Sequence, residues 1–120
     1  MNQSLTKSQP RPRLESFDWG SMTWLLDAST CPEADLSLAR MVLEPGRAAP
    51  AHRHPDCQEA LHVLAGSVEL RRDGEVRLLA AGDSALIPQG LAHDLSNPGE
   101  VPAVLMIAYG SGARRYEALG

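Results

Sequence analysis

Three histidines and one glutamate stand where their side chains could meet at a metal ion. His52 and His54 are two residues apart, Glu59 follows five residues after His54, and His93 comes 34 residues after Glu59. Imidazole nitrogens and a carboxylate oxygen in this mixture suit a divalent transition metal and leave coordination positions open for a ligand. We therefore expect a metal-centred site for a small molecule, with these four residues as ligands.

The spacing also predicts how these side chains are positioned. In an extended segment, residues two apart point to the same face, so His52 and His54 would present both imidazoles together. Glu59 opens an apolar run, and every second residue of that run would share its inward face. His93 follows a Pro-Gln-Gly turn at 88–90 and is expected on a later strand that returns across the fold.

The segments around the candidate ligands have the composition of short strands. Runs rich in Val, Leu and Ile are separated by Gly, Pro, Asp and Asn, and an Asp-Gly pair at 73–74 predicts a hairpin. The runs cover residues 36–43, 60–64, 68–71, 76–79, 85–87 and 101–109. Strands this short with turns this frequent indicate an antiparallel barrel or sandwich. Residues 113–119 could add a single terminal turn.

The length and composition predict one domain. A chain of 120 residues, of which 43% are hydrophobic, is expected to bury one core. Residues 1–13 contain two prolines, polar residues and charge, with almost nothing to bury. We therefore expect a flexible N-terminal segment over 1–13 and a single domain over 14–120.

The charge distribution argues against several classes of protein. The net charge is −4, and residues 1–13 carry +3, so the remainder carries −7. An acidic body disfavours nucleic-acid binding, which needs a basic surface. No apolar stretch approaches the roughly 18 residues of a membrane span, and residues 1–20 show no secretory signal. Cys31 and Cys57 make no disulfide framework, and we expect a cytoplasmic protein.

The two blocks that contain the candidate ligands resemble the two signature motifs of the cupin superfamily. The first motif has the pattern Gly-x5-His-x-His-x4-Glu-x6-Gly, and the second has the pattern Gly-x5-Pro-x-Gly-x2-His-x3-Asn. The matching residues are Gly46, His52, His54, Glu59 and Gly66 in the first block, and Gly82, Pro88, Gly90, His93 and Asn97 in the second. Every signature position is matched within residues 46–97.

The resemblance implies an all-β fold, a small jelly-roll β-barrel, with one metal ion bound by His52, His54, Glu59 and His93. With a single copy of the motif pair, the chain looks like a monocupin. Cupins of this size often dimerise through edge strands and N-terminal segments, so we expect a homodimer. This ligand set accepts iron, manganese, nickel, copper or zinc, and the metal identity stays open.

Three further residues have both a structural and a functional interpretation. Cys57 is expected to pack under a loop, and a metal-binding or adduct-forming thiolate is the alternative. His62 should point to the face opposite Glu59, on the outer sheet or at a dimer interface. Arg40 should point outward, and the capture of a substrate carboxylate is the alternative.

Structural roles are also expected for the two tryptophans, for Asn97 and for the arginine pair near the C-terminus. Trp19 and Trp24 should supply apolar area to the core or to a dimer contact, with stacking on a ligand at the barrel mouth as the alternative. Asn97 should hold a turn through side-chain hydrogen bonds. The arginine pair at 114–115 is most simply a solvated terminus.

The chemistry of the expected pocket favours an enzyme. Its walls should be mostly Leu, Val, Met, Ile and Ala, and no second acid or base is evident beside the ligands. The first hypothesis is a metal-dependent oxygenase, lyase or isomerase that acts on a small oxygenated organic molecule. The alternative is a non-catalytic small-ligand binding or sensing module.

Overall fold

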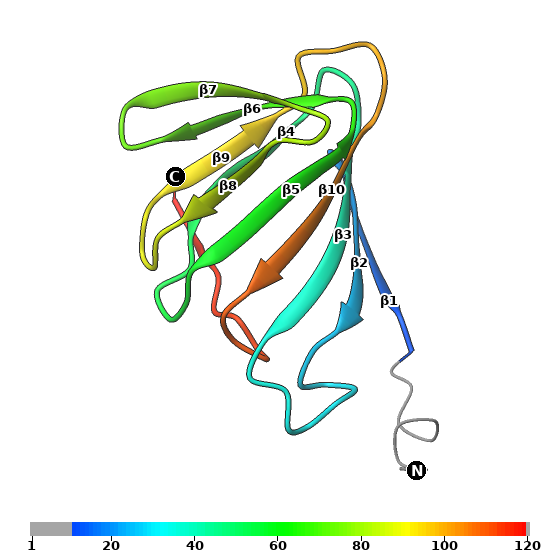
Figure 1. The fold of residues 1–120 in the computed structure, drawn as a ribbon, viewed down its shortest axis with the longest axis vertical. Helices are drawn as coiled ribbons and strands as arrows, with labels where there is room; N and C mark the ends of the chain where they lie inside the picture. Colours follow the sequence, from blue (N-terminus) through cyan, green and yellow to red (C-terminus); the bar gives the residue numbers. More distant parts are fainter. Residues whose placement is uncertain (1–10, 120) are drawn as a thin grey trace.

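Two antiparallel β-sheets face each other in the computed structural model, which describes residues 11–119 (Figure 1). The six-stranded sheet has the order β1 (Arg13–Phe17), β2 (Gly20–Leu26), β3 (Ser37–Leu43), β10 (Ala103–Tyr109), β5 (Glu59–Ala65) and β8 (Ser84–Ile87). The five-stranded sheet has the order β11 (Glu117–Ala118), β4 (Ala48–Arg53), β9 (His93–Ser96), β6 (Ser67–Arg72) and β7 (Glu75–Ala80).

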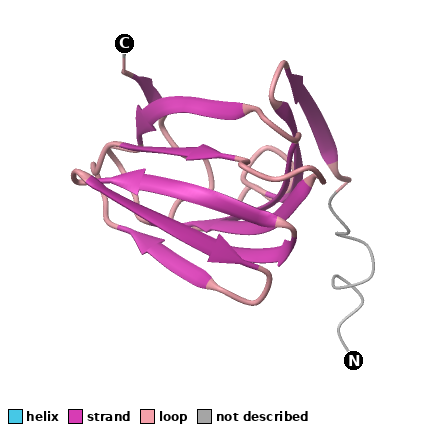
Figure 2. Ribbon diagram, turned by 90° about the horizontal axis from the view of Figure 1, so that it is seen from above, coloured by secondary structure: helices cyan, strands magenta, loops and turns pink. Residues whose placement is uncertain are grey.

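The expected all-β jelly-roll fold is confirmed, in the form of a sandwich. Within residues 11–119, no backbone ladder joins the two sheets into a closed barrel. The view from above shows the strands wrapped around a common interior (Figure 2). The same part of the chain contains no helix long and apolar enough to cross a membrane.

Alternation of apolar and polar residues decides which face of each strand is buried. Ala39, Met41 and Leu43 on β3 point into the sandwich, whereas Arg40 between them is exposed. Strand β10 alternates in the same way and lies between β3 and β5. Because a strand repeats every two residues, one slip in register would expose this whole inner face.

The six predicted strand runs all correspond to strands, with ends that differ by at most two residues. The hairpin at 73–74 is also confirmed, since Asp73 has a φ of 51° and Gly74 a φ of 75° between β6 and β7. Both residues take the left-handed conformation that a two-residue hairpin turn requires.

The two N-terminal strands were not predicted from the sequence. All five residues of β1 are exposed, so its sequence carries no inward and outward alternation. The strand is held by its ladder with β2 and by Arg13, whose guanidinium donates to Asp27 Oδ2 at 2.6 Å. The flexible segment expected over 1–13 is therefore wrong at Arg13, and residues 1–10 lie outside the described part of the chain.

The C-terminal turn expected over 113–119 is wrong as well. Glu117 and Ala118 form β11, which pairs with Arg53 and His52 at the edge of β4. A carboxylate oxygen of Glu117 also accepts hydrogen bonds from the Arg53 guanidinium. Pairing with an open sheet edge satisfies backbone groups that a lone helical turn would leave to water.

We expect Gly20→Ala to destabilise the fold strongly. Gly20 has a φ of +149°, and a Cβ there would lie 1.9 Å from the Val42 carbonyl oxygen. The matched control is Gly74→Ala, which also has a positive φ but no atom within 4 Å of the added methyl group. Thermal and urea unfolding should show a loss of more than about 3 kcal/mol for Gly20→Ala and about 1 kcal/mol for the control. Equal losses would contradict the steric argument.

Candidate metal centre

The four predicted ligands converge on one point inside the sandwich. His52 lies near the end of β4, His54 just after that strand, Glu59 begins β5 and His93 begins β9. Strands β4 and β9 are paired so that His52 lies opposite His93, which places the two imidazoles side by side. One ligand atom from each of the four residues lies within 4.8 Å of the others.

The three imidazoles are held in one orientation by the main chain. In each, the Nδ1 atom lies at hydrogen-bond distance from a carbonyl oxygen, which can only accept, so Nδ1 carries the proton. The pairs are His52 with Pro50 at 2.8 Å, His54 with Arg115 at 2.8 Å, and His93 with Leu91 at 3.0 Å. Nε2 of each ring is thereby left as the free lone pair, as in histidines that bind metals.

The polar atoms at the centre of the cluster have no hydrogen-bond partner in the described structure. These atoms are His54 Nε2, Glu59 Oε1 and His93 Nε2, and all three are buried. Glu59 Oε1 lies 3.2 Å from His54 Nε2 and 3.3 Å from His93 Nε2. Buried polar groups are rarely left unsatisfied, and inward lone pairs of nitrogen and oxygen are what a divalent cation would satisfy. The residues present therefore fit a metal ion.

The surroundings of Glu59 and His52 favour the protonation states in which these two side chains can bind a cation. Burial by itself raises the pKa of Glu59, but its contacts with His54 and His93 outweigh burial and lower that pKa to about 2. Burial lowers the pKa of His52 to about 4. Burial also acts to lower the pKa of His93, yet the adjacent Glu59 carboxylate outweighs it and raises that pKa. At neutral pH, Glu59 is therefore ionised and His52 is neutral.

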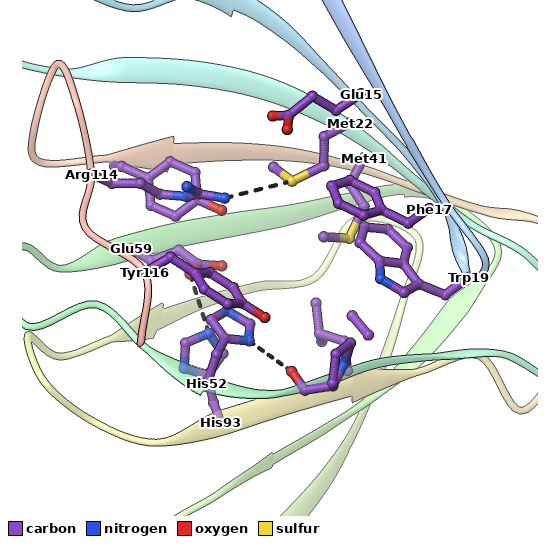
Figure 3. A pocket seen from close by; sticks show the side chains of 14 residues that line it. Glu15, Phe17, Trp19, Met22, Met41, His52, Glu59, His93, Arg114 and Tyr116 are labelled. Atoms are coloured by element: carbon purple, nitrogen blue, oxygen red, sulfur yellow. Dashed lines mark hydrogen bonds and ion pairs between the residues drawn. The ribbon is translucent and has the colours of Figure 1, made fainter. Parts of the chain in front are cut away.

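A cavity of about 350 Å³ is lined by three of the four residues, His52, Glu59 and His93 (Figure 3). Phe17 and Trp19, which lie on β1 and in the turn after it, stack with ring centroids 4.6 Å apart and form one wall. Met22, Met41 and Leu95 add further apolar surface to the cavity lining. The site thus combines a polar floor with apolar walls, as small-ligand sites usually do.

The C-terminal segment, residues 110–119, closes the opposite side of the cavity. Tyr116 stacks on His52 with ring centroids 4.6 Å apart and planes inclined by 17°. The guanidinium of Arg114 lies over Trp24 at 4.6 Å and over Tyr109 at 4.9 Å from the ring centroids. The expectation of a solvated arginine pair is therefore wrong for Arg114.

Apart from His52, Glu59 and His93, the sequence analysis missed the polar side chains that line the cavity. Glu15, Tyr109, Arg114 and Tyr116 all line it, although the walls were expected to be mostly Leu, Val, Met, Ile and Ala. Glu15 lies on an exposed strand and Arg114 and Tyr116 lie in a short terminal segment, so neither periodicity nor a motif pointed to them. Glu15, Arg114 and Tyr116 reach the site only because the β1–β2 hairpin and the C-terminal segment lie over the cavity, whereas Tyr109 is on the inner face of β10.

The alternative functional interpretations of three residues receive no support from the geometry. Cys57 is 4% exposed and is not among the four converging ligands, and burial raises the pKa of its thiol to about 11. His62 points away from Glu59, and its Nδ1 lies 2.6 Å from Ser84 Oγ. Arg40 is exposed on the outer face of β3, as predicted.

The two tryptophans are buried as expected, and Asn97 holds a turn through side-chain hydrogen bonds as expected. Trp19 and Trp24 are both buried, and Trp19 is also a wall of the cavity. Trp24 packs against Tyr109 and donates from Nε1 to Glu15 Oε1 at 2.6 Å. The Asn97 amide donates to the carbonyl oxygens of Leu43 and Val101 at 2.9 Å each, and its Oδ1 accepts from the Gly99 amide.

Comparison with known proteins decides the family. The family model described as the cupin domain matches residues 39–109, which is more than half of the chain. The chain belongs to the cupin family. The matched region contains both motifs and all four converging residues of this cupin, so the resemblance seen in the sequence is confirmed.

Two plant proteins are similar to this cupin in alignments of 81 positions that cover 63% of its chain. Germin-like protein subfamily 3 member 3 of Arabidopsis thaliana is 38% identical, and the match covers 38% of that protein. Auxin-binding protein ABP19b of Prunus persica is 37% identical, and the match covers 39% of that protein. The similarity therefore spans well under half the length of these relatives.

A solved structure of an oxalate oxidase in complex with glycolate has the same fold. It superposes with a TM-score of 0.75 at 26% sequence identity, and the match covers 84% of this cupin and 56% of that chain. The cupin sandwich is thus supported by a solved structure of similar fold.

We expect His93→Ala to lose metal and His62→Ala to retain it. His93 presents a buried Nε2 to the ligand cluster, whereas His62 lies on the outer face beside Ser84. Removing one of four ligands should weaken metal binding by roughly tenfold or more. Elemental analysis of both variants, after loading with one metal and desalting, makes the comparison. Equal metal content in the two variants would disprove the ligand assignment.

Proposed function

We propose that this cupin binds one divalent transition metal ion and is an enzyme that acts on a small oxygenated organic molecule. The ligands in this proposal are His52, His54, Glu59 and His93. The proposal rests on one observation. Three imidazoles, each oriented by a main-chain carbonyl, and one ionised carboxylate converge beside an open cavity. Metal sites that keep positions open to a cavity are generally catalytic.

The chemistry available depends on the metal, and the surrounding residues determine what can reach it. When bound, a transition metal supplies Lewis-acid or redox chemistry to an oxygen donor. Phe17, Trp19 and Met41 contribute apolar surface to the cavity wall. Tyr116 packs flat on His52 and keeps that imidazole from turning away from the cluster. This chain therefore contributes the orientation of the ligands and a shaped, largely apolar space.

The comparisons support organic acids as the substrate class. The oxalate oxidase of similar fold was solved with glycolate, a small hydroxy acid. Since this cupin covers only 56% of that chain, the transfer of the substrate class is part of the proposal. The homodimer and the cytoplasmic location expected from the sequence stay predictions.

A second candidate function is small-ligand binding without turnover. It is favoured by the similarity to proteins named for auxin binding, at 37% identity over 81 residues. In this role the same cavity would hold an organic ligand against the metal, and the binding of that ligand would itself be the function.

We expect the metal-loaded protein to turn over at least one small oxygenated compound. The protein is stripped of metal and reloaded separately with iron(II), manganese, nickel, copper or zinc. Each form is then given oxalate, glycolate, a 1,3-diketone, a flavonol or a sugar phosphate. Dioxygen consumption and product formation are measured together.

The control is His93→Ala, which should lose both metal and turnover while keeping the fold. A full complement of metal without turnover on any compound would favour the binding function. Failure of every metal to bind would contradict both candidate functions.

A further inference from the structure

Arg114 is a charged side chain in the cavity for which the metal centre itself provides no role. Among the described residues that line the cavity, it is the one permanent cation. Its guanidinium is covered by aromatic rings, with Trp24 at 4.6 Å, Tyr109 at 4.9 Å and Tyr116 at 5.7 Å from its Cζ atom to the ring centroids. Stacking of this kind holds a guanidinium in place and leaves its N–H edge free to donate.

The guanidinium has no anionic partner in the described structure. Within residues 11–119, no carboxylate oxygen lies within 4.0 Å of an Arg114 nitrogen. Its Nε is buried without a hydrogen-bond partner. One terminal nitrogen is 4.0 Å from the Met22 sulfur, which is a weak acceptor (Figure 3). A stacked, partly buried guanidinium with unused donors is therefore aimed into an open cavity.

Glu15 is the one carboxylate besides Glu59 among the lining residues, and it is already engaged. Its Oε1 accepts a hydrogen bond from Trp24 Nε1 at 2.6 Å and lies 3.5 Å from the Arg13 guanidinium. Glu15 therefore leaves the Arg114 guanidinium without neutralisation.

One aromatic ring, that of Tyr109, lies near both the guanidinium and the candidate metal centre. The Tyr109 ring centroid lies 4.9 Å from Arg114 Cζ and 5.0 Å from the His54 ring centroid. The space beside it is bounded by the stacked Phe17 and Trp19 rings. A ligand that reaches both polar ends must therefore carry an apolar body between them.

From this geometry we propose that Arg114 binds the carboxylate of an amphipathic organic acid whose opposite end carries an oxygen donor for the metal. The inference rests on the proposed function for its metal-facing end. A carboxylate matches the guanidinium edge with two parallel hydrogen bonds. The apolar body of the acid, an aromatic ring or a short hydrocarbon, lies against Phe17, Trp19 and Met41. The sequence alternative of Arg40 as the carboxylate anchor is replaced, since Arg40 points out of the sandwich.

The test compares an acid with its neutral counterpart. The probes are 4-hydroxybenzoate and 4-hydroxybenzamide, which differ at the group that would face Arg114. Binding is measured by isothermal titration calorimetry on zinc-loaded protein, because zinc is redox-silent and permits no oxidative turnover. The wild type should bind the acid at least about tenfold more tightly than the amide.

Three variants locate the source of that preference. Arg114→Gln should remove it, so that acid and amide bind about equally. Arg114→Lys should keep part of it, because the charge remains but the two-pronged hydrogen bonding is lost. The matched control Arg40→Gln removes the same charge from an exposed site and should leave the preference unchanged. Zinc content and thermal unfolding of each variant show whether the fold and the ligand cluster are intact.

The outcomes separate this inference from the proposed function. If Arg114→Gln retains the preference, or the wild type has none, the inference is overturned, even where zinc binds normally. The same titrations on metal-free protein show whether the anion site works without the metal. If no metal binds but the preference for the acid still depends on Arg114, the metal function fails and the anion site stands.

Discussion

The hydrogen bonds from three imidazole Nδ1 atoms to main-chain carbonyl oxygens are the constraint on which the site depends. The carbonyls of Pro50 and Leu91 lie two residues before the histidines that they hold, whereas that of Arg115 is 61 residues from His54. A free imidazole can present either nitrogen, and a metal site built from rotating rings would lose affinity with each wrong orientation. Here the backbone selects the tautomer, so the cluster is organised before any ligand arrives.

This organisation leaves polar atoms facing one another in a buried space. Glu59 is 2% exposed and ionised, and it lies against two imidazoles whose inward nitrogens have no other partner. Burying such groups is costly unless they are paired. Around them, the strand pairing of β4 with β9 and the aliphatic inner faces of β3, β5 and β10 supply the rigidity that holds them together.

The two ends of the chain complete the cavity from opposite sides. The β1–β2 hairpin provides the Phe17 and Trp19 wall, and the C-terminal segment provides Arg114 and Tyr116. The same C-terminal segment supplies the Arg115 carbonyl that orients His54. One segment therefore both lines the cavity and orients one candidate metal ligand. Chemistry at the floor and selectivity at the walls come from different parts of the sequence, which is how one fold serves many ligands.

The sequence alone determined the strand runs and the four converging residues, because both follow from patterns of residue spacing along the chain. Alternation every two residues buries Ala39, Met41 and Leu43, and the fixed motif spacing names His52, His54, Glu59 and His93. The exposed strand β1 and the role of Arg114 have no such pattern. Their positions follow from pairing with β2 and from packing on Trp24 and Tyr109. Contacts between residues about 90 positions apart, such as Met22 with Arg114, exist only once both sheets have formed, so the tertiary structure alone decided the shape and charge of the cavity.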